Sequence, residues 1–340
     1  MSEPAIGVVI PKVGGLAQPP AVDDLGAFGQ WVEELGYESV WTSEGWGSDS
    51  FVDLTAIARH TDRVRVGTAV VNVFTRTPAG LAMAIASLDR EADGRAVLGL
   101  GAGHPKLVEN LHDITYERPL RRMHETIELV RALLGSDEDV SYEGQLFEAT
   151  DFPGLDRDVP IYSAALGETN RRVTGLFSDG WLPYHVPFSQ LETAFETVAT
   201  AAEEAGRDVD DLVVNPFVPA AVSDDSTAAR DVIRENLAGY IGAFTDDSYK
   251  NVVHAAYPDE TEAIADQWRS GDESAAAAAV TDEMVDDFGV AGTAEEARER
   301  LDEIATNPVV DVPLVVVPHG TYDAVGEATI RALAPNSGND

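Results

Sequence analysis

Three alternating glycines followed by a histidine end an apolar run, in the stretch AVLGLGAGHP at residues 96–105. A Rossmann dinucleotide turn has the spacing G-x-G-x-x-G in the first strand–helix unit, with an acidic residue about 20 positions later. Here Gly99, Gly101 and Gly103 follow G-x-G-x-G in the fourth unit, so that fingerprint is weak. The glycines could let a flat ring lie against bare backbone, or they could serve packing alone. His104 could exchange protons near neutral pH, or simply bond to the loop backbone.

A second candidate site is the stretch AALGETNRR at residues 164–172. Gly167 precedes a predicted helix start near Glu168–Asn170, and the free amides of such a start can bind a phosphate. Arg171 and Arg172 follow, which is unusual in a chain this acidic. The stretch predicts an anion site, although a solvated helix face is an equal alternative.

Other site chemistries have little support. His104, His185 and His319 all fall at predicted strand ends, but none belongs to an H-x-H or H-E-x-x-H pair, so we expect no metal site. The chain has no cysteine, which excludes disulfides and thiolate metal sites. It also lacks the G-x-S-x-G elbow of α/β hydrolases.

The elements that position these residues alternate between short β-branched runs and amphipathic stretches. Eight strands, each followed by a helix, favour an α/β fold of the (β/α)8 TIM-barrel type over a doubly wound sheet, as one domain over residues 1–340. Ser189–Glu192 and Thr293–Glu296 fit capping boxes that start helices. The predicted strands are Ala5–Ile10, Ser39–Trp41, Val64–Val71, Ala96–Gly99, Pro160–Ala164, Gly180–Leu182, Leu212–Val222 and Val312–Val317, and the clearest helices are Asp23–Leu35, Pro78–Glu91, Leu120–Leu134 and Gln190–Glu204.

Two segments interrupt this rhythm. Residues 140–154 are predicted to form a small hairpin before strand five. Residues 224–292 are too long for one connection and predict a helical insertion before strand eight. In a barrel the carboxyl ends of the strands carry the chemistry. This rule brings Glu44, Trp46 and Arg76 to the rim beside the two candidate sites.

The charge of the chain is strongly negative. Sixty acidic residues against 23 basic ones give −37, and only Lys12, Lys106 and Lys250 are lysines. We expect a solvated acidic surface, a salt-rich (halophilic) cytoplasm and marginal stability in dilute buffer. No basic stripe favours nucleic acid. No apolar stretch approaches the roughly 18 residues of a membrane span, and the first residues do not resemble a signal peptide, so we expect a cytoplasmic protein.

Several stretches, in order and spacing, resemble the luciferase-like monooxygenase superfamily, and within it the coenzyme F420-dependent branch that includes methylenetetrahydromethanopterin reductase. They include ESVWTSEGWGSDSF, the long stretch from DRVRVG through the three glycines to GHPKLVE, VSYEGQLFEATDF and VPIYSAALGETNRRVTGLFSDGWLP. Coverage is thinnest over residues 224–279. The resemblance implies a TIM barrel, commonly a homodimer, with the deazaflavin across the mouth and a non-prolyl cis peptide near Ala69–Val70.

The resemblance also implies roles for individual residues. Glu44 and His104 are the expected catalytic residues. The resemblance implies that Glu44 contacts the ring region, whereas His104 is expected to act as general acid because an imidazole of ordinary pKa exchanges protons near neutral pH. Relatives that oxidise sugar phosphates carry histidine at the position of Gly45 and glutamate at that of His104, which disfavours this substrate. The expected cofactor-binding residues are Ala69, Val70, Asn72, Gly101, Gly103, Leu166, Gly167, Thr169 and Arg171.

The sequence therefore predicts an F420-dependent oxidoreductase that transfers a hydride between the deazaflavin and a small organic substrate. Two alternatives remain: an FMN-dependent monooxygenase of the same fold, and a relative that binds a cofactor without turnover. The identity of the substrate and the direction of transfer are open.

Overall fold

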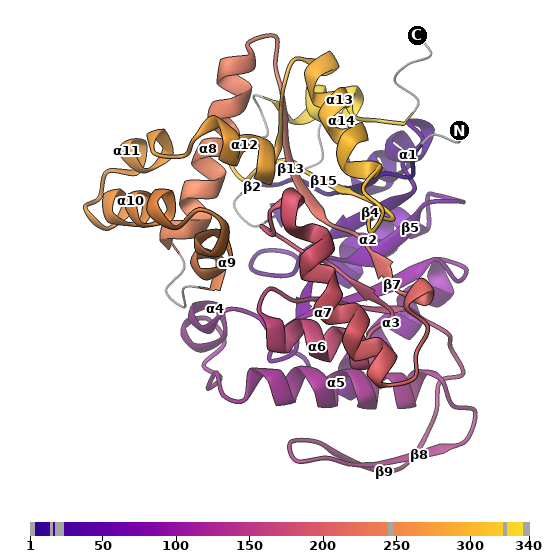
Figure 1. Cartoon of the computed structure of the whole chain (residues 1–340). Helices are drawn as coiled ribbons and strands as arrows, with labels where there is room; N and C mark the ends of the chain where they lie inside the picture. Colours follow the sequence, from indigo (N-terminus) through magenta and orange to yellow (C-terminus); the bar gives the residue numbers. More distant parts are fainter. Residues whose placement is uncertain (1–3, 14–15, 18–23, 244–247, 322–324, 336–340) are drawn as a thin grey trace.

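A curled parallel sheet forms the centre of the molecule (Figure 1). The computed structural model describes residues 4–13, 16–17, 24–243, 248–321 and 325–335. The path of hydrogen-bonded strands runs β12-β11-β10-β7-β5-β4-β1-β15-β13-β14, and every pairing along it is parallel. The strands are β1 (Gly7–Val9), β4 (Ser39–Thr42), β5 (Arg65–Thr68), β6 (Val71–Asn72), β7 (Ala96–Gly101), β10 (Ile161–Ala164), β11 (Gly180–Trp181), β12 (Val213–Val214), β13 (Phe217–Val222), β14 (Val290–Gly292) and β15 (Leu314–Val316).

The first strand of this path, β12, and its ninth strand, β13, come from one predicted strand that is divided in the structure. The sequence predicts a single strand over Leu212–Val222, but the structure divides it at Asn215–Pro216. Proline has no N–H to give to a ladder, which explains the break. Next to the break, the amide of Phe217 donates to the carbonyl oxygen of Pro183 at 2.9 Å. The amide of Leu314 donates to the carbonyl oxygen of Pro216 at 2.8 Å. The same segment therefore contacts both β11 and β15.

All eight predicted strand positions contain strands, so the prediction of an α/β fold with a parallel sheet is confirmed. The predicted strand Val64–Val71 is also divided, into β5 and β6, on either side of Ala69–Val70. β14, which the sequence did not predict, pairs with β13.

Helices cover the outer face of the sheet (Figure 1). The four clearest predicted helices are present within one or two residues of their expected bounds in the described ranges. The helices are α1 (Leu25–Glu34), α2 (Ser50–Ala58), α3 (Pro78–Glu91), α4 (Pro105–Asn110), α5 (Pro119–Leu134), α6 (Glu168–Phe177), α7 (Leu191–Glu204), α8 (Ser226–Ala243), α9 (Ser248–Ala256), α10 (Pro258–Arg269), α11 (Glu273–Ala278), α12 (Asp282–Phe288), α13 (Ala294–Ala305) and α14 (Glu327–Ala332).

One of the two predicted capping boxes is confirmed and the other is wrong. Thr293 and Glu296 form both hydrogen bonds of a capping box at the start of α13. Ser189 instead donates its amide and its hydroxyl to the carboxylate of Asp287, each at 2.8 Å, and α7 begins at Leu191 without a side-chain cap. Ser189 therefore bonds to a buried carboxylate 98 residues away in place of forming the predicted capping box.

Two segments stand out from the sheet–helix alternation. The predicted hairpin is present as β8 (Asp139–Glu143) and β9 (Glu148–Pro153), which pair antiparallel and project from the body of the molecule (Figure 1). Between β13 and β14 the chain forms α8 to α12, which stack together beside α4 (Figure 1). A second short antiparallel pair, β2 (Lys12–Val13) with β3 (Leu16–Ala17), lies near the N-terminus.

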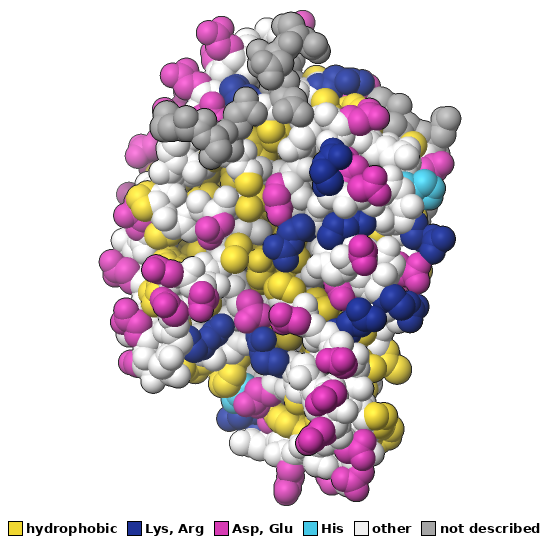
Figure 2. Space-filling model, turned by 90° about the vertical axis from the view of Figure 1, so that its right-hand side faces the viewer, with side chains coloured by type: hydrophobic (Ala, Val, Ile, Leu, Met, Phe, Trp, Pro, Cys, Tyr) yellow, Lys and Arg dark blue, Asp and Glu magenta, His cyan; other side chains and the backbone are white. Residues whose placement is uncertain are grey.

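Charged side chains cover much of the surface. Figure 2 shows acidic side chains over large parts of one face and basic side chains gathered across its middle. Many arginines pair with acids, for example Arg131 with Asp179 at 2.9 Å and Arg230 with Asp286 at 2.6 Å. Because acids outnumber bases by 60 to 23, such pairs leave most carboxylates without a basic partner.

Two glycines of the sheet are required by packing. A Cβ on Gly67 would lie 2.2 Å from the Trp41 ring, and a Cβ on Gly99 would lie 1.9 Å from the carbonyl oxygen of Thr68. Thr68 also accepts from the amide of Gly99 and donates to its carbonyl, both at 2.8 Å. The first glycine of the G-x-G-x-G stretch therefore lets β7 approach β5. At this position the glycine serves packing, one of the two roles left open by the sequence.

Substituting alanine at Gly99 is expected to destabilise the protein by about 1–3 kcal/mol, because a backbone oxygen cannot move aside as a side chain can. Chemical denaturation measures this loss as a lower midpoint with an unchanged slope. Gly45→Ala is the matched control, since its Cβ would meet nothing within 4 Å. Equal stability of Gly99→Ala and Gly45→Ala would contradict the packing role.

Candidate functional site

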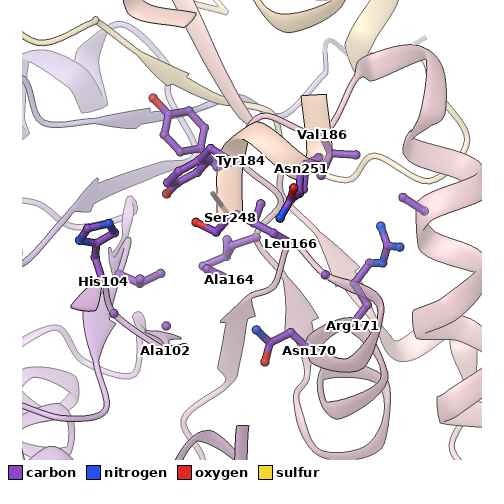
Figure 3. A pocket seen from close by; sticks show the side chains of 18 of the residues that line it. Ala102, His104, Ala164, Leu166, Asn170, Arg171, Tyr184, Val186, Ser248 and Asn251 are labelled. Atoms are coloured by element: carbon purple, nitrogen blue, oxygen red, sulfur yellow. The ribbon is translucent and has the colours of Figure 1, made fainter. Parts of the chain in front are cut away.

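A cavity of about 720 Å³ opens beyond the carboxyl ends of the sheet strands (Figure 3). Residues that follow β4, β6, β7, β10 and β11 form its floor and sides, and helices α4, α6, α7 and α9 contribute the rest. It is lined by Glu44, Val70, Asn72, Gly101, Ala102, Gly103, His104, Leu107, Tyr116, Ala164, Leu166, Gly167, Asn170, Arg171, Leu182, Tyr184, Val186, Pro187, Gln190, Thr193, Ala194, Ser248, Tyr249, Asn251, Val252 and Ala255.

The structure brings most of the predicted site residues together in this cavity. Ala69 and Thr169 do not line it: Ala69 is buried inside the curled sheet with Trp41, and Thr169 is exposed on α6. The predicted residues that do line it are Glu44, Val70, Asn72, Gly101, Gly103, His104, Leu166, Gly167 and Arg171.

The bend at the end of β5 has the predicted geometry. The peptide bond Ala69–Val70 is cis, as the resemblance implied. A Cβ on Gly101 would lie 2.6 Å from the Val70 side chain, so the second glycine of the stretch makes room for Val70 at the cavity wall. Gly103 has φ +74°, in the left-handed region that favours glycine, and it turns the chain so that His104 occupies the N-cap position of α4, without a capping hydrogen bond from its side chain.

Glu44 is held as a fixed negative charge. Its two carboxylate oxygens accept from Nε and Nη2 of Arg76, each at 2.8 Å, and one also accepts from the amide and hydroxyl of Ser50. Arg76 additionally binds Asp49 at 2.6 Å. Burial opposes the charge on Asp49, but the hydrogen bond from Arg76 lowers the pKa of Asp49 below its ordinary value. Bidentate pairing of this kind fixes the orientation of Glu44.

Arg171 is the contrasting group, a cation with no ion-pair partner among the described residues. Within the described part of the chain no carboxylate forms an ion pair with its guanidinium, and its Nε is buried without a hydrogen bond. Burial lowers the pKa of Arg171, and the charge of Glu168 partly opposes this. Arg172, the next residue, pairs with Glu204 at 2.7 Å. Of the two predicted arginines, only Arg171 lines the cavity.

The start of α6 adds donors beside Arg171. Gly167 is its N-cap residue, and no side chain caps this ten-residue helix. Amides of an uncapped first turn carry partial positive charge and have no intrahelical acceptor. Together with Arg171 they can hold an anionic group at this end of the cavity.

An aromatic cluster at the other end was not predicted. It consists of Tyr184, His185, Tyr240 and Tyr249. The ring centroid of Tyr184 lies 4.0 Å from that of His185, 5.0 Å from that of Tyr240 and 6.1 Å from that of Tyr249. Burial raises the pKa of both Tyr184 and Tyr240 far above the ordinary value, so both remain neutral phenols. Of the four residues, Tyr184 and Tyr249 line the cavity.

His185 lies behind Tyr184 and is fully enclosed. It is 3% exposed, its φ is +54°, and neither ring nitrogen has a hydrogen-bond partner among the described residues. Burial lowers the pKa of His185 to about 3. The imidazole is therefore neutral across the physiological range.

The buried imidazole predicts an acid-sensitive stability. The unfolded chain protonates His185 below about pH 6.5, whereas the folded chain does so only near pH 3. The contribution of the neutral imidazole to the free energy of unfolding is therefore fully present above pH 6.5 and is lost as the pH falls. The resulting loss between pH 8 and pH 5 is about 2 kcal/mol. Denaturation curves at the two pH values should show that His185→Asn loses about 2 kcal/mol less unfolding free energy than the wild type. Asparagine is chosen because it tolerates the left-handed backbone at this position. Equal losses in both proteins would contradict a neutral buried imidazole.

Two features are absent from the described residues. No group of three or more histidine, aspartate or glutamate side chains there could hold a metal ion. No helix in those ranges combines the length and the apolar character needed to cross a membrane.

The sequence and the structure match known proteins over nearly their full length. The family model described as luciferase-like monooxygenase matches residues 6–311. A Mycobacterium tuberculosis protein, provisionally named a coenzyme F420-dependent oxidoreductase, is 30% identical over 317 residues, covering 86% of this chain and 90% of its own. The 5,10-methylenetetrahydromethanopterin reductase of Methanolobus tindarius is 29% identical over 281 residues, covering 82% and 85%. The solved structure of the coenzyme F420-dependent tetrahydromethanopterin reductase of Methanopyrus kandleri has a TM-score of 0.75 at 21% identity, covering 98% and 97%.

Proposed function

The chain belongs to the luciferase-like monooxygenase family, and within it we propose that this protein is a coenzyme F420-dependent oxidoreductase. It would transfer a hydride between the deazaflavin and a small organic substrate. Support comes from the relative of about 30% identity whose provisional name includes the same coenzyme, and which this chain covers for 90% of its length. We also take the curled sheet to be a (β/α)8 barrel, with residues 224–292 as its helical insertion.

The observation that carries the proposal is Arg171. Coenzyme F420 has a flat deazaflavin and an anionic tail. A half-buried cation that forms no ion pair among the described residues, next to the uncapped amides of α6, fits a phosphate of that tail. In a chain of net charge −37, leaving this one arginine unpaired inside a cavity favours a ligand that supplies the negative charge.

The floor of the cavity fits the flat ring. Val70, Gly101, Ala164 and Leu166 offer small or apolar surfaces there. When bound, the coenzyme supplies the hydride chemistry. The chain's own residues would orient it, with Glu44 as a fixed charge near the ring and an imidazole nitrogen of His104 exchanging the proton.

We further propose that two copies of the chain associate. Trp46 and Val52 are each 67% exposed, and Met83 is 59% exposed. Val52 and Met83 lie on the adjacent helices α2 and α3, and Trp46 lies in the loop before α2. Exposed apolar side chains on neighbouring elements are typical of an interface.

Titration of the purified protein with oxidised F420 in high salt tests the function. We expect saturable binding of the oxidised coenzyme. In a separate assay with reduced F420, we expect the coenzyme to be reoxidised when a suitable acceptor is added. A protein that binds no F420 but retains a flavin spectrum would favour the FMN alternative. Binding of F420 without turnover, across a broad set of acceptors, would favour a non-catalytic relative.

A further inference from the structure

The cavity has two chemically different ends (Figure 3). The side chains of His104, Tyr184 and Ser248 lie on one side of it, and those of Asn170 and Arg171 lie on the other. Leu166 lies between them. If the Arg171 end holds the anionic tail of the coenzyme, the opposite end is left for the substrate.

Among the described residues, the end around His104 has no charged side chain available to a ligand. Of the described lining residues only Glu44 and Arg171 carry formal charge, and both oxygens of Glu44 are already bound by Arg76. Helix α9 presents uncharged residues to the cavity, including Ser248 and Val252.

The charged residues of α9 are directed elsewhere. Lys250 pairs with Glu262 of α10 at 2.9 Å, and His254 lies 3.7 Å from the same carboxylate. In a chain with 24% charged residues, this arrangement leaves one wall of the cavity neutral.

Tyr184 is the best-positioned polar group at this neutral end. Its ring is fixed by His185 at 4.0 Å, by Phe217 at 5.1 Å and by the edge of Tyr240 at 5.0 Å. The hydroxyl oxygen of Tyr184 accepts a hydrogen bond from Tyr240, which leaves its own hydrogen to donate. A phenol that is held rigidly and stays neutral donates a hydrogen bond at little entropic cost.

Resting on the proposed function, we infer that this end binds an uncharged substrate, through an oxygen or nitrogen atom that accepts a hydrogen bond from Tyr184. A carboxylate or phosphate placed there would be desolvated without a counter-charge, which is costly. Aldehydes, ketones, imines and activated alkenes of modest size satisfy both requirements. Sugar phosphates do not.

A matched pair of probes tests the charge requirement. Acetophenone and 4-acetylbenzoate share a ring and a ketone but differ by one carboxylate. Calorimetric titration into protein loaded with oxidised F420, which has no hydride to give, should show acetophenone binding at least 10-fold more tightly. A pH of 8 keeps ordinary imidazoles neutral during the measurement. Equal or tighter binding of 4-acetylbenzoate would overturn the inference.

Variants test the two groups separately. Tyr184→Phe should weaken acetophenone binding about 3- to 10-fold, the usual size of one neutral hydrogen bond, and leave F420 binding unchanged. Tyr142→Phe removes a phenol that bonds Glu128 near the hairpin, and serves as the control. Leu107→Lys adds a cation one turn after His104 on α4 and should bring the affinity for 4-acetylbenzoate up to that for acetophenone. Unchanged acetophenone binding by Tyr184→Phe would refute the role of this phenol.

The outcomes separate this inference from the function on which it rests. Failure of F420 to bind the wild-type protein would contradict the proposed function. Tight F420 binding together with indifference to the charge of the probe would contradict only the neutral-substrate inference.

Discussion

Replacing Arg171 by glutamine is expected to weaken F420 binding about 10- to 100-fold, measured by fluorescence titration at fixed salt. Hydrogen bonds to a charged partner contribute about 1.5–3 kcal/mol, and each 1.4 kcal/mol corresponds to a factor of ten. The guanidinium is already half-buried and unpaired among the described residues, so the protein bears part of its desolvation cost before the ligand arrives. Glutamine keeps part of the hydrogen-bonding capacity, but it removes the charge and shortens the side chain.

Arg172→Gln is the matched control for this measurement. It lies one position along α6, but its guanidinium pairs with Glu204 and is not part of the cavity lining. Its loss should change F420 affinity by less than 2-fold. If both variants bind F420 as tightly as the wild type, the anionic tail does not contact Arg171. Equal weakening by both would indicate a general electrostatic effect of α6.

The positions of the strands along the chain could be predicted because each strand is short, apolar and buried. Strands such as β7 (Ala96–Gly101) appear in the sequence as apolar runs between polar stretches, and their parallel pairing follows from the helices between them. The two divisions of predicted strands were harder to foresee. Pro216 gave a local signal for one of them, since it has no N–H to donate. The other falls at the cis bond Ala69–Val70, which only the resemblance implied.

The floor of the cavity was predictable from the rule that chemistry collects at strand ends, but its partnerships were not. Glu44 and Arg76 both lie at predicted strand ends, yet 32 residues separate them, and nothing local shows that they form a bidentate pair. The same applies to Arg171 and Arg172. Adjacent in sequence, they differ because one helix position points into the cavity and the next toward Glu204.

The aromatic end was missed for a different reason. Tyr184 was visible at the end of a predicted strand, but Tyr240 and Tyr249 come from α8 and α9, in the stretch where the resemblance is thinnest. Aromatic residues at helical spacing also occur in ordinary cores, so their types alone carry no functional signal. Only their convergence on Tyr184 and His185 in three dimensions distinguishes them.

The distribution of charge links the site to the behaviour of the whole molecule. Among the described residues the cavity lining contains one cation without an ion pair, Arg171, whereas acidic side chains cover large parts of the surface (Figure 2). Each pair of like charges about 10 Å apart costs about 0.4 kcal/mol in water without salt. Summed over an acidic surface, this repulsion is comparable with the whole free energy of unfolding of a typical domain, about 5–15 kcal/mol.

The protein is therefore expected to gain several kcal/mol of unfolding free energy between 0.1 M and 2 M KCl. The Debye length falls from about 10 Å at 0.1 M to about 3 Å at 1 M, which removes most repulsion between separated surface carboxylates. Pairs in contact, such as Arg76 with Glu44, are screened much less and should persist. Urea denaturation at several KCl concentrations measures the gain as a rise in the midpoint.

A charge-neutralised variant separates screening from other effects of salt. Glu196→Gln and Glu203→Gln on α7, combined with Glu299→Gln and Asp302→Asn on α13, remove four exposed carboxylates whose side chains have no hydrogen bond or ion pair among the described residues. If repulsion destabilises the protein at low salt, this variant should be more stable than the wild type at 0.1 M KCl. The difference should shrink toward zero at 2 M. A constant difference at all concentrations, or wild-type stability independent of KCl, would show that the acidic surface does not control folding. Potassium chloride acts weakly on apolar burial compared with sulfate salts, so a strong KCl dependence identifies charge screening as the cause.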